Sequence, residues 1–456
     1  MADHSTAAAA GCRRQHVAIE IEPAATDSNL VTSILQQMET VSSLHSICRA
    51  SPTRRESSKK SYTPQKVAIG PYHRDGATAA EPLRPMEDHK WRYVHALLGR
   101  RTDLEASLND CVSALRELEQ RSRACYAGDD VDLPAGDEFV KVMFLDGCFI
   151  IELFLKYSTK VLRRRNDPIF AVPGMLYDLR CDLALLENQI PLFVLQRLFQ
   201  VVPIPKQCAN LSLAELAFRF FKNMIPGDIL IHREKFTQEG NHLLDLICHC
   251  LLPTLPRLPS SKSQKHLRSV TDLHSSGIKI KRAKTENLLD VKFVNGILKL
   301  PQIEVHQHTE LLFRNLIALE QCSNVHGTVH HVTSYVVLVA SLIESERDVK
   351  FLRQRGILTS YDDDDNGGEK EAGIRKLFGK LCEEVELNES YYDGLCERVN
   401  GHRGKNLRAL KKKLKRRRNN GSRPTLRLVM LFTVLVLLIA IVGTLFSVLT
   451  FVHHHI

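Results

Sequence analysis

The C-terminal part of the chain restricts the fold more than any other segment. Residues 428–452 form a run of 25 residues without a charge, a proline, an asparagine or a glutamine. An α-helix of that length extends about 37 Å, enough to cross the hydrocarbon core of a bilayer with some tilt. A helix buried in a protein core is rarely apolar on every side for so many turns. We therefore expect residues 428–452 to form a transmembrane helix.

A basic segment lies directly before this run. Twelve of the 62 Lys and Arg residues fall within 401–427, where no Asp or Glu occurs, which leaves 50 basic against 52 acidic residues elsewhere. A nearly neutral body argues against a nucleic-acid-binding surface. Because Lys and Arg beside a span stay cytosolic, we expect a tail-anchored, single-pass protein with a cytosolic body and the short tail, 453–456, outside. The plasma membrane and the endoplasmic reticulum both remain open.

The same basic segment is a candidate membrane-surface patch. Cations beside an anionic leaflet each contribute about 1 kcal/mol to binding, so membrane lipid is one expected partner. The alternative, that these cations only fix the topology, stays open. The patch consists of Lys411, Lys412, Lys413, Lys415, Arg416, Arg417 and Arg418.

The body has the composition of a packed domain, with 44% hydrophobic and 25% charged residues. We expect a mainly α fold: a disordered N-terminus at 1–26 and one extended helical domain at 27–400. Asn295–Gly296 between alternating apolar runs predicts a small β-hairpin within 288–305. Apolar spacing predicts helices at 27–47, 86–125, 139–160, 176–190, 211–224, 242–252, 310–322, 332–344, 349–355, 372–386 and 391–400.

The helix expected at 176–190 meets a proline at its end. Pro191 removes a backbone donor, so a kink or break is expected near Gln189 and a carbonyl near Glu187 is left unpaired. Asn188 and Gln189 carry amide groups that can donate to such carbonyls.

Twelve cysteines are scattered along the chain without the spacing of a disulfide framework. With a cytosolic body we expect them to be reduced and mostly buried. The chain also holds three N-x-[ST] glycan acceptors, Asn210, Asn388 and Asn420, which stay unmodified in the cytosol.

No phosphate-binding loop, dinucleotide fingerprint, zinc-protease motif or nucleophile elbow occurs in the sequence. Four weaker clusters remain, and for each the ordinary structural reading is favoured over a metal site or a catalytic group. They are His242 with Cys248-His249-Cys250; Asp146-Gly147-Cys148; Asp182 with Glu187-Asn188-Gln189; and His326, His330 and His331.

The order of several long motifs resembles the plant family named domain of unknown function 247. The resemblance covers about residues 27–452. The motifs are VAIGPYHR, MEDHKWRYVHALL, FLDGCFIIELF, DLALLENQIPLFVLQRLF, LLDVKFVNGILKLPQIEV, ELLFRNLIALEQC, TSY, DVKFLRQRGIL, LFGKLCEEV and YYDGLCERVN, followed by the C-terminal apolar run. The chain departs from the family at 401–420, which is almost purely basic where aromatics usually accompany Arg. It also departs at Ser276-Gly277-Ile278-Lys279-Ile280, where the change is conservative.

This resemblance implies an α-rich plant protein with a C-terminal span and no established enzymatic activity or cofactor. Some grass members are implicated in pollen-side self-incompatibility and others are associated with stress or defence. The family assigns no role to the matched residues. These are Gly70, Pro71, Tyr72, His73, Asp146, Gly147, Cys148, Asp182, Glu187, Asn188, Gln189, Ile190, Pro191, Phe313, Arg314, Asn315, Glu320 and Gln321.

The sequence thus favours a membrane-tethered, non-enzymatic interaction or signalling protein with an unidentified protein partner. We expect no cofactor, no metal, no nucleic acid and no small-molecule substrate. Three alternatives stay open: a self-incompatibility recognition component, an enzyme of unrecognised type that uses Asp182 and Glu187 or Asp146 and Cys148, and a lipid-binding tether.

Overall fold

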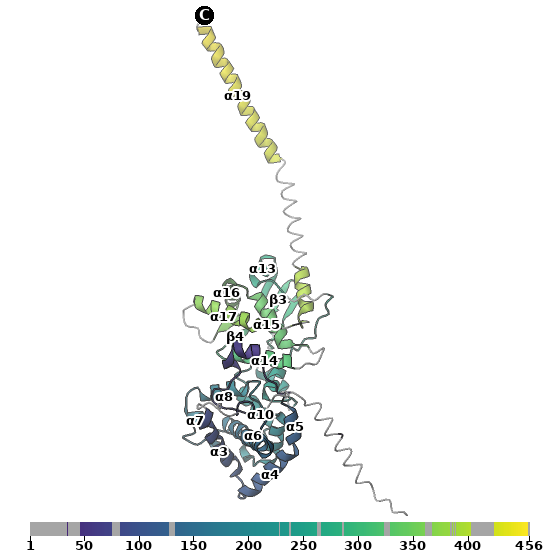
Figure 1. The fold of residues 1–456 in the computed structure, drawn as a ribbon. Helices are drawn as coiled ribbons and strands as arrows, with labels where there is room; N and C mark the ends of the chain where they lie inside the picture. Colours follow the sequence, from purple (N-terminus) through teal and green to yellow (C-terminus); the bar gives the residue numbers. More distant parts are fainter. Residues whose placement is uncertain are drawn as a thin grey trace, which may run out of the picture.

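The computed structural model describes most of the chain and is mainly helical, with a few short strands, as expected from the sequence (Figure 1). The described residues are 34, 46–74, 83–126, 133–227, 229–236, 239–261, 266–284, 287–322, 329–360, 367–383, 385, 387, 389–402 and 424–454.

One group of helices surrounds α6 (Gly136–Ser158). This helix packs against four others, and its residues from Phe139 to Lys156 are almost all buried. A helix that is apolar on every side requires this central position. The helices that cover it are α3 (Arg84–Leu98), α4 (Leu104–Glu117), α9 (Leu192–Val201) and α10 (Leu213–Phe221).

Shorter elements complete this part of the chain. They are α2 (Pro52–Ser57), η1 (Lys59–Ser61), α5 (Glu119–Ala124), η4 (Lys160–Leu162), α7 (Pro168–Ala171), α8 (Met175–Leu183), η5 (Lys206–Cys208), α11 (Ile229–Lys235) and α12 (Leu243–Leu251). The short helix α13 (Val270–Ser275) packs instead against α16 (Glu346–Gln354) and β1 (Lys279–Arg282).

A second group of helices packs with two small sheets. The helices are α14 (Thr309–Cys322), α15 (His331–Leu342), α16 (Glu346–Gln354) and α17 (Gly367–Cys382), and residues 393–402 are helical as well. The strands are β1 (Lys279–Arg282), β2 (Lys292–Val294), β3 (Ile297–Leu300), β4 (Ile303–Val305) and β5 (Leu358–Ser360).

The predicted hairpin is confirmed for β2 and β3, which pair antiparallel. Asn295 and Gly296 have φ angles of 50° and 77°, the left-handed pair that such a tight turn needs. The rest of the segment behaves differently. β1 joins β3 in parallel, and β4 leaves to pair in parallel with β5.

Two expected helices are shorter than the apolar spacing indicated. The helix expected at 86–125 is broken after Leu98, and α4 begins only after Asp103, whose carboxylate accepts a hydrogen bond from the Ala106 amide. The helix expected at 176–190 ends at Leu183 instead of near Gln189. The first helix ends at Gly99, and Asp103 begins the next one; after α8, the side-chain amides of Asn188 and Gln189 bind the last carbonyls, although the apolar spacing continues.

Residues 46–74 are largely irregular, yet most of their apolar side chains are buried. Ile47 pairs with Tyr126 of the first group, whereas η1 packs against α14 of the second. This segment, which we call the N-terminal strap (residues 46–74), therefore contacts both groups of helices.

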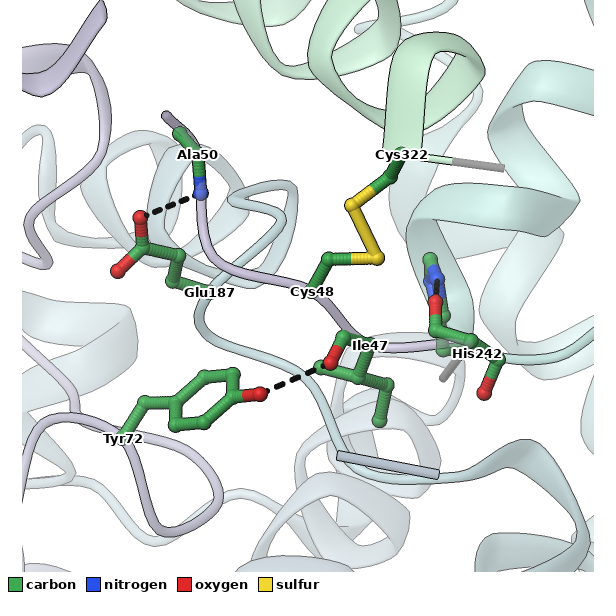
Figure 2. Close-up of a disulfide and its surroundings, with 8 residues drawn as sticks. Ile47, Cys48, Ala50, Tyr72, Glu187, His242 and Cys322 are labelled. Atoms are coloured by element: carbon green, nitrogen blue, oxygen red, sulfur yellow. Dashed lines mark hydrogen bonds between the residues drawn. A yellow bond between two sulfur atoms is a disulfide. The ribbon is translucent and has the colours of Figure 1, made fainter. Parts of the chain in front are cut away.

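A disulfide joins Cys48 of the strap to Cys322 at the end of α14 (Figure 2). The expectation that the cysteines are reduced is therefore wrong for this pair. The remaining cysteines within the described ranges form no disulfide, and each is buried or half-buried.

The helix α19 (Pro424–His454) stands apart from the other elements in Figure 1. Its side chains are described at 429–445 and 447, and all of them are exposed. Among the residues that the structure describes, no helix is long and apolar enough to cross a membrane.

Candidate functional site

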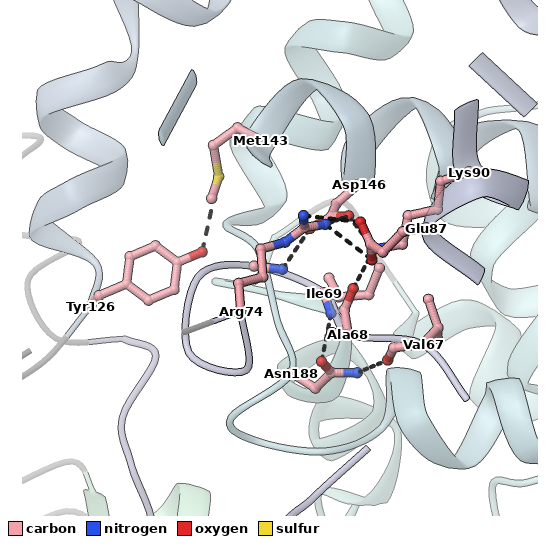
Figure 3. Close-up of polar contacts among 11 residues, drawn as sticks. Val67, Ala68, Ile69, Arg74, Glu87, Lys90, Tyr126, Met143, Asp146 and Asn188 are labelled. Atoms are coloured by element: carbon pink, nitrogen blue, oxygen red, sulfur yellow. Dashed lines mark hydrogen bonds and ion pairs between the residues drawn. The ribbon is translucent and has the colours of Figure 1, made fainter. Parts of the chain in front are cut away.

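The structure brings the matched motifs of the first half of the chain together at one place. We call this place the motif cluster and define it by Gly70, Pro71, Tyr72, His73, Asp146, Gly147, Cys148, Asp182, Glu187, Asn188, Gln189 and Pro191. It lies where the strap meets α6 and the turn after α8 (Figure 3).

Asp146 is the charged centre of the cluster and is fully buried on α6. One carboxylate oxygen accepts a hydrogen bond of 2.8 Å from the Gly70 amide. The other accepts from the Arg74 guanidinium at 2.6 Å and from the Lys90 ammonium at 2.7 Å. Glu87 contacts both cations and so balances their charge. The contacts fix the end of the strap on α6 and α3.

Asp182 holds the strap a few residues before Gly70. Its two oxygens accept hydrogen bonds from the amides of Gln65, Lys66 and Val67 at 2.6 to 2.9 Å. Burial raises the pKa of Asp182 to about 6, although these three amides act in the opposite direction. The carboxylate therefore works as an anchor for backbone donors.

The two amide side chains of the cluster, Asn188 and Gln189, form hydrogen bonds that hold the turn after α8. Asn188 donates to the carbonyls of Asp182 and Val67 and accepts from the Ile69 amide at 2.6 Å. The interpretation that these amides satisfy orphaned carbonyls is confirmed, but the carbonyls lie at the end of α8, before the position that Pro191 suggested.

Gln189 completes this turn. Its Nε2 donates to the carbonyls of Leu183 and Leu185, and its Oε1 accepts from the Leu244 amide of α12. Its backbone carbonyl accepts a hydrogen bond from the Tyr126 hydroxyl.

Glu187 holds the beginning of the strap beside the disulfide (Figure 2). Its carboxylate accepts a hydrogen bond of 3.0 Å from the Ala50 amide and lies 3.7 Å from the Arg55 guanidinium. Tyr72, near the other end of the strap, also contacts the beginning of the strap: its hydroxyl donates a hydrogen bond to the Ile47 carbonyl at 2.9 Å.

Gly70 is required by both its backbone and its surroundings. Its φ of +73° lies in the left-handed region, and an added Cβ would sit 2.4 Å from the Gln189 carbonyl oxygen. Gly147 allows α6 to approach α9, since a Cβ there would lie 2.3 Å from a methyl group of Leu198.

Cys148 lacks the surroundings of a reactive thiol. It is fully buried among apolar side chains, and this burial raises its pKa well above the usual thiol value. A nucleophilic cysteine needs the opposite, an accessible thiolate. His73 is half-buried, and burial with the nearby Arg49 and Arg55 lowers its pKa to about 4.

Sequence reasoning missed the cations of the cluster, Arg74 and Lys90. Lys90 offered a signal, because it shares the apolar face of α3 with Met86, Tyr93 and Leu97. A lysine on a buried face must find a carboxylate. The partner itself, Asp146, could not be identified from spacing.

A second buried group of charges, formed by Asp167 at the start of α7 and Lys156 of α6, was also missed. Asp167 accepts from the Tyr93 hydroxyl at 2.8 Å and from the Lys156 ammonium at 3.0 Å. Burial alone would raise the pKa of Asp167, but Tyr93, Lys156 and the nearby His89 outweigh it and hold this pKa below its usual range. The Lys156 ammonium also lies 3.6 Å from the Tyr93 ring centre.

The other candidates from the sequence do not form a site. His242 caps α12, since its Nδ1 accepts from the Asp245 amide and its Nε2 contacts the Ser46 carbonyl. Cys248 and Cys250 are buried, and within the described ranges no three side chains of metal-ligand type are grouped. His326 and the basic patch 411–418 lie outside the described residues.

A cavity of about 460 Å³ lies elsewhere, between the chain at 257–261 and the helical residues 393–402. No residue of the motif cluster lines it. Its lining residues are Arg257, Leu258, Pro259, Ser260, Ser261, Glu389 and Asp393.

Three glycine variants separate the requirements at Gly70. Gly70→Ala should destabilise the protein more than Gly174→Ala, because both positions have a left-handed φ but only Gly70 faces a backbone atom. The cost at Gly174 should be about 1–2 kcal/mol. Gly373→Ala, in an open helical position, should stabilise by about 0.5–1 kcal/mol. Urea unfolding of the full chain in detergent measures all three, and equal costs at Gly70 and Gly174 would contradict the close contact.

Removing the charge at the centre of the cluster should be costly. Asp146→Asn leaves Glu87 to balance both Lys90 and Arg74, so one positive charge of the cluster is uncompensated, which should lower the free energy of unfolding by about 3–5 kcal/mol. Asp137→Asn is the matched control on the same helix, since that side chain is 80% exposed and its ion pair contributes at most about 1 kcal/mol. Similar losses for both variants would show that Asp146 is not a buried anchor.

The low pKa of His73 predicts a dependence of stability on pH. Between about pH 6.5 and pH 4 the unfolded chain binds a proton that the folded chain does not, so stability falls as the pH falls. Between pH 7 and pH 5, the His73→Asn variant should lose up to about 2 kcal/mol less stability than the wild type. His95→Asn, an exposed histidine on α3, serves as the control. An unchanged pH dependence in His73→Asn would contradict this assignment.

Comparisons with known proteins agree with the motifs. The chain matches, over residues 47–439, a family described as plant protein of unknown function. It is 30% identical over 367 residues to a UPF0481 protein of Arabidopsis thaliana, with coverage of 75% of this chain and 73% of the relative. A second UPF0481 protein of that plant is 25% identical over 440 residues, with coverage of 73% and 79%. No solved structure matches the chain. The chain therefore belongs to the plant family named domain of unknown function 247.

Proposed function

We propose that this protein is a membrane-tethered, non-enzymatic interaction protein, whose helical domain presents a rigid surface to a protein partner. One observation carries this proposal: the polar groups of the motif cluster bind the protein's own backbone and hold the strap in place.

The carboxylates of the cluster are poorly suited to acid–base catalysis. Asp146 and Asp182 are 0% and 2% exposed, and both oxygens of each accept hydrogen bonds from the chain. A catalytic carboxylate must reach a proton of the substrate. Glu187 binds a different part of the strap from Asp182, so the two carboxylates do not act as a pair. These contacts favour an architectural role for the cluster.

The proposed membrane tether is the apolar run at residues 428–452. The exposed side chains of α19 include long apolar ones such as Leu431, at 70%, and Phe432, at 67%. Such a continuous apolar surface marks a membrane or protein contact. The hydroxyls of Thr433 and Thr444 donate to carbonyls of their own helix, which satisfies polar groups in the way that lipid requires.

The sequence shows that the proposed span is long enough to cross a bilayer core. The described side chains at 429–445 cover about 25 Å of helix, which is shorter than a bilayer core. The complete apolar run, 428–452, is long enough.

Charged substitutions in this run test the tether in the full chain. Ile439→Arg with Val442→Arg should release the protein from plant membranes at alkaline pH, because each arginine near the middle of a span costs about 2.5–3.5 kcal/mol. Ile439→Leu with Val442→Leu is the control and should stay in the membrane pellet, like the wild type. Release of the wild type, or retention of the arginine variant, would contradict the proposal.

A further inference from the structure

The disulfide between Cys48 and Cys322 carries information about the compartment of the domain. The two residues are separated by 274 positions in the sequence. Disulfides persist in oxidising compartments and are rare in the cytosol, where thiol pools keep cysteines reduced. The compartment of a protein with a built-in disulfide is therefore expected to be the lumen of the secretory pathway or the cell exterior.

The fold itself places Cys48 for this bond (Figure 2). On one side of Cys48, the Ile47 amide donates to the Cys125 carbonyl at 2.8 Å. On the other side, the Ala50 amide donates to the buried carboxylate of Glu187. Cys48 is only 6% exposed, and Cys322 ends a helix of the core. The pairing thus results from two fixed segments.

The remaining thiols fit an oxidising compartment as well. Every other cysteine within the described residues is buried or half-buried. An exposed thiol would be open to oxidation and to pairing with other chains. Seven of the nine free thiols in the described ranges are buried, and only Cys181 and Cys382 are partly accessible, so the bond between Cys48 and Cys322 has few competitors there.

A glycan acceptor is exposed on the same domain. Asn210 lies in the turn between η5 and α10, and its side chain is exposed. It belongs to the acceptor sequence Asn210-Leu211-Ser212. The Ser212 hydroxyl accepts from the Glu215 amide and begins α10, so the turn ends at a fixed point. The other acceptors, Asn388 and Asn420, lie outside the described residues.

We propose that the helical domain lies on the oxidising side of the membrane and that Asn210 carries an N-linked glycan. This inference goes beyond the tether, because it assigns the side of the membrane. It reverses the orientation expected from the basic segment 401–427. Flanking charge biases insertion, but long domains translocate largely regardless of charge, whereas the disulfide belongs to the folded product.

Disulfide formation and N-glycosylation can both take place in that compartment, because the electron acceptor and the sugar donor are available there. The thiols of Cys48 and Cys322 lose two protons and two electrons to an oxidised dithiol carrier, and an S–S bond forms. The Asn210 amide nitrogen loses a proton and bonds to the first sugar of a lipid-linked oligosaccharide, whose bond to the lipid pyrophosphate breaks.

The test uses the full chain expressed in plant cells. Free thiols are alkylated at lysis, and the glycan is removed by an endoglycosidase before electrophoresis and peptide mapping. The wild type should lose mass on this treatment and should yield the linked peptides of Cys48 and Cys322. Asn210→Gln should lack one glycan. Asn166→Gln should keep the Asn210 glycan, because Asn166 is also exposed but lies in no acceptor sequence. Ser212→Thr should keep this glycan as well, because threonine retains the acceptor sequence.

Two results would overturn the proposal, each on its own. One is an Asn210 peptide without a glycan in the wild type, and the other is alkylated Cys48 and Cys322 in place of the linked peptides. Either can occur while the protein still resists alkaline extraction, so failure of this inference is distinguishable from failure of the membrane tether.

Discussion

The buried carboxylate of Asp146 is the interaction on which this architecture depends. It joins a central helix, the cations Arg74 and Lys90, and the backbone of a largely irregular segment at Gly70, where no helix or strand is present. Such a charge is costly to bury alone and is acceptable only when its partners are complete. The surrounding groups, Asp182 and Asn188, repeat the same principle with backbone amides. The strap is thereby held by buried polar contacts as much as by apolar packing.

This arrangement also explains how the two groups of helices become one structure. The strap is fixed to the first group by the motif cluster and to the second by the bond from Cys48 to Cys322. In the chain-entropy description, closing a loop of such length stabilises a fold by about 5 kcal/mol. The motif residues and the disulfide therefore serve the same end, since both place residues 46–74.

Sequence reasoning predicted features that depend on near neighbours. The apolar run at 139–160 required a buried helix, Asn295–Gly296 required a turn, and the amides of Asn188 and Gln189 were assigned to orphaned carbonyls. It failed where a distant partner decides the outcome. Asp146 binds an amide 76 positions away, and Cys48 binds a thiol 274 positions away. Neither partner leaves a periodic signal. The lysine on the apolar face of α3 was a sign that a buried carboxylate is needed, but sequence reasoning missed it.

Hydrogen exchange of the strap amides tests the central claim most directly. The amides of Val67, Ile69 and Gly70 donate to side chains of the motif cluster, outside any helix or sheet. If these contacts anchor the fold, the three amides should exchange as slowly as those in the middle of α6, and only through global unfolding. Fast exchange at these amides while α6 stays protected would contradict the account, because the strap would then open without disturbing the helices.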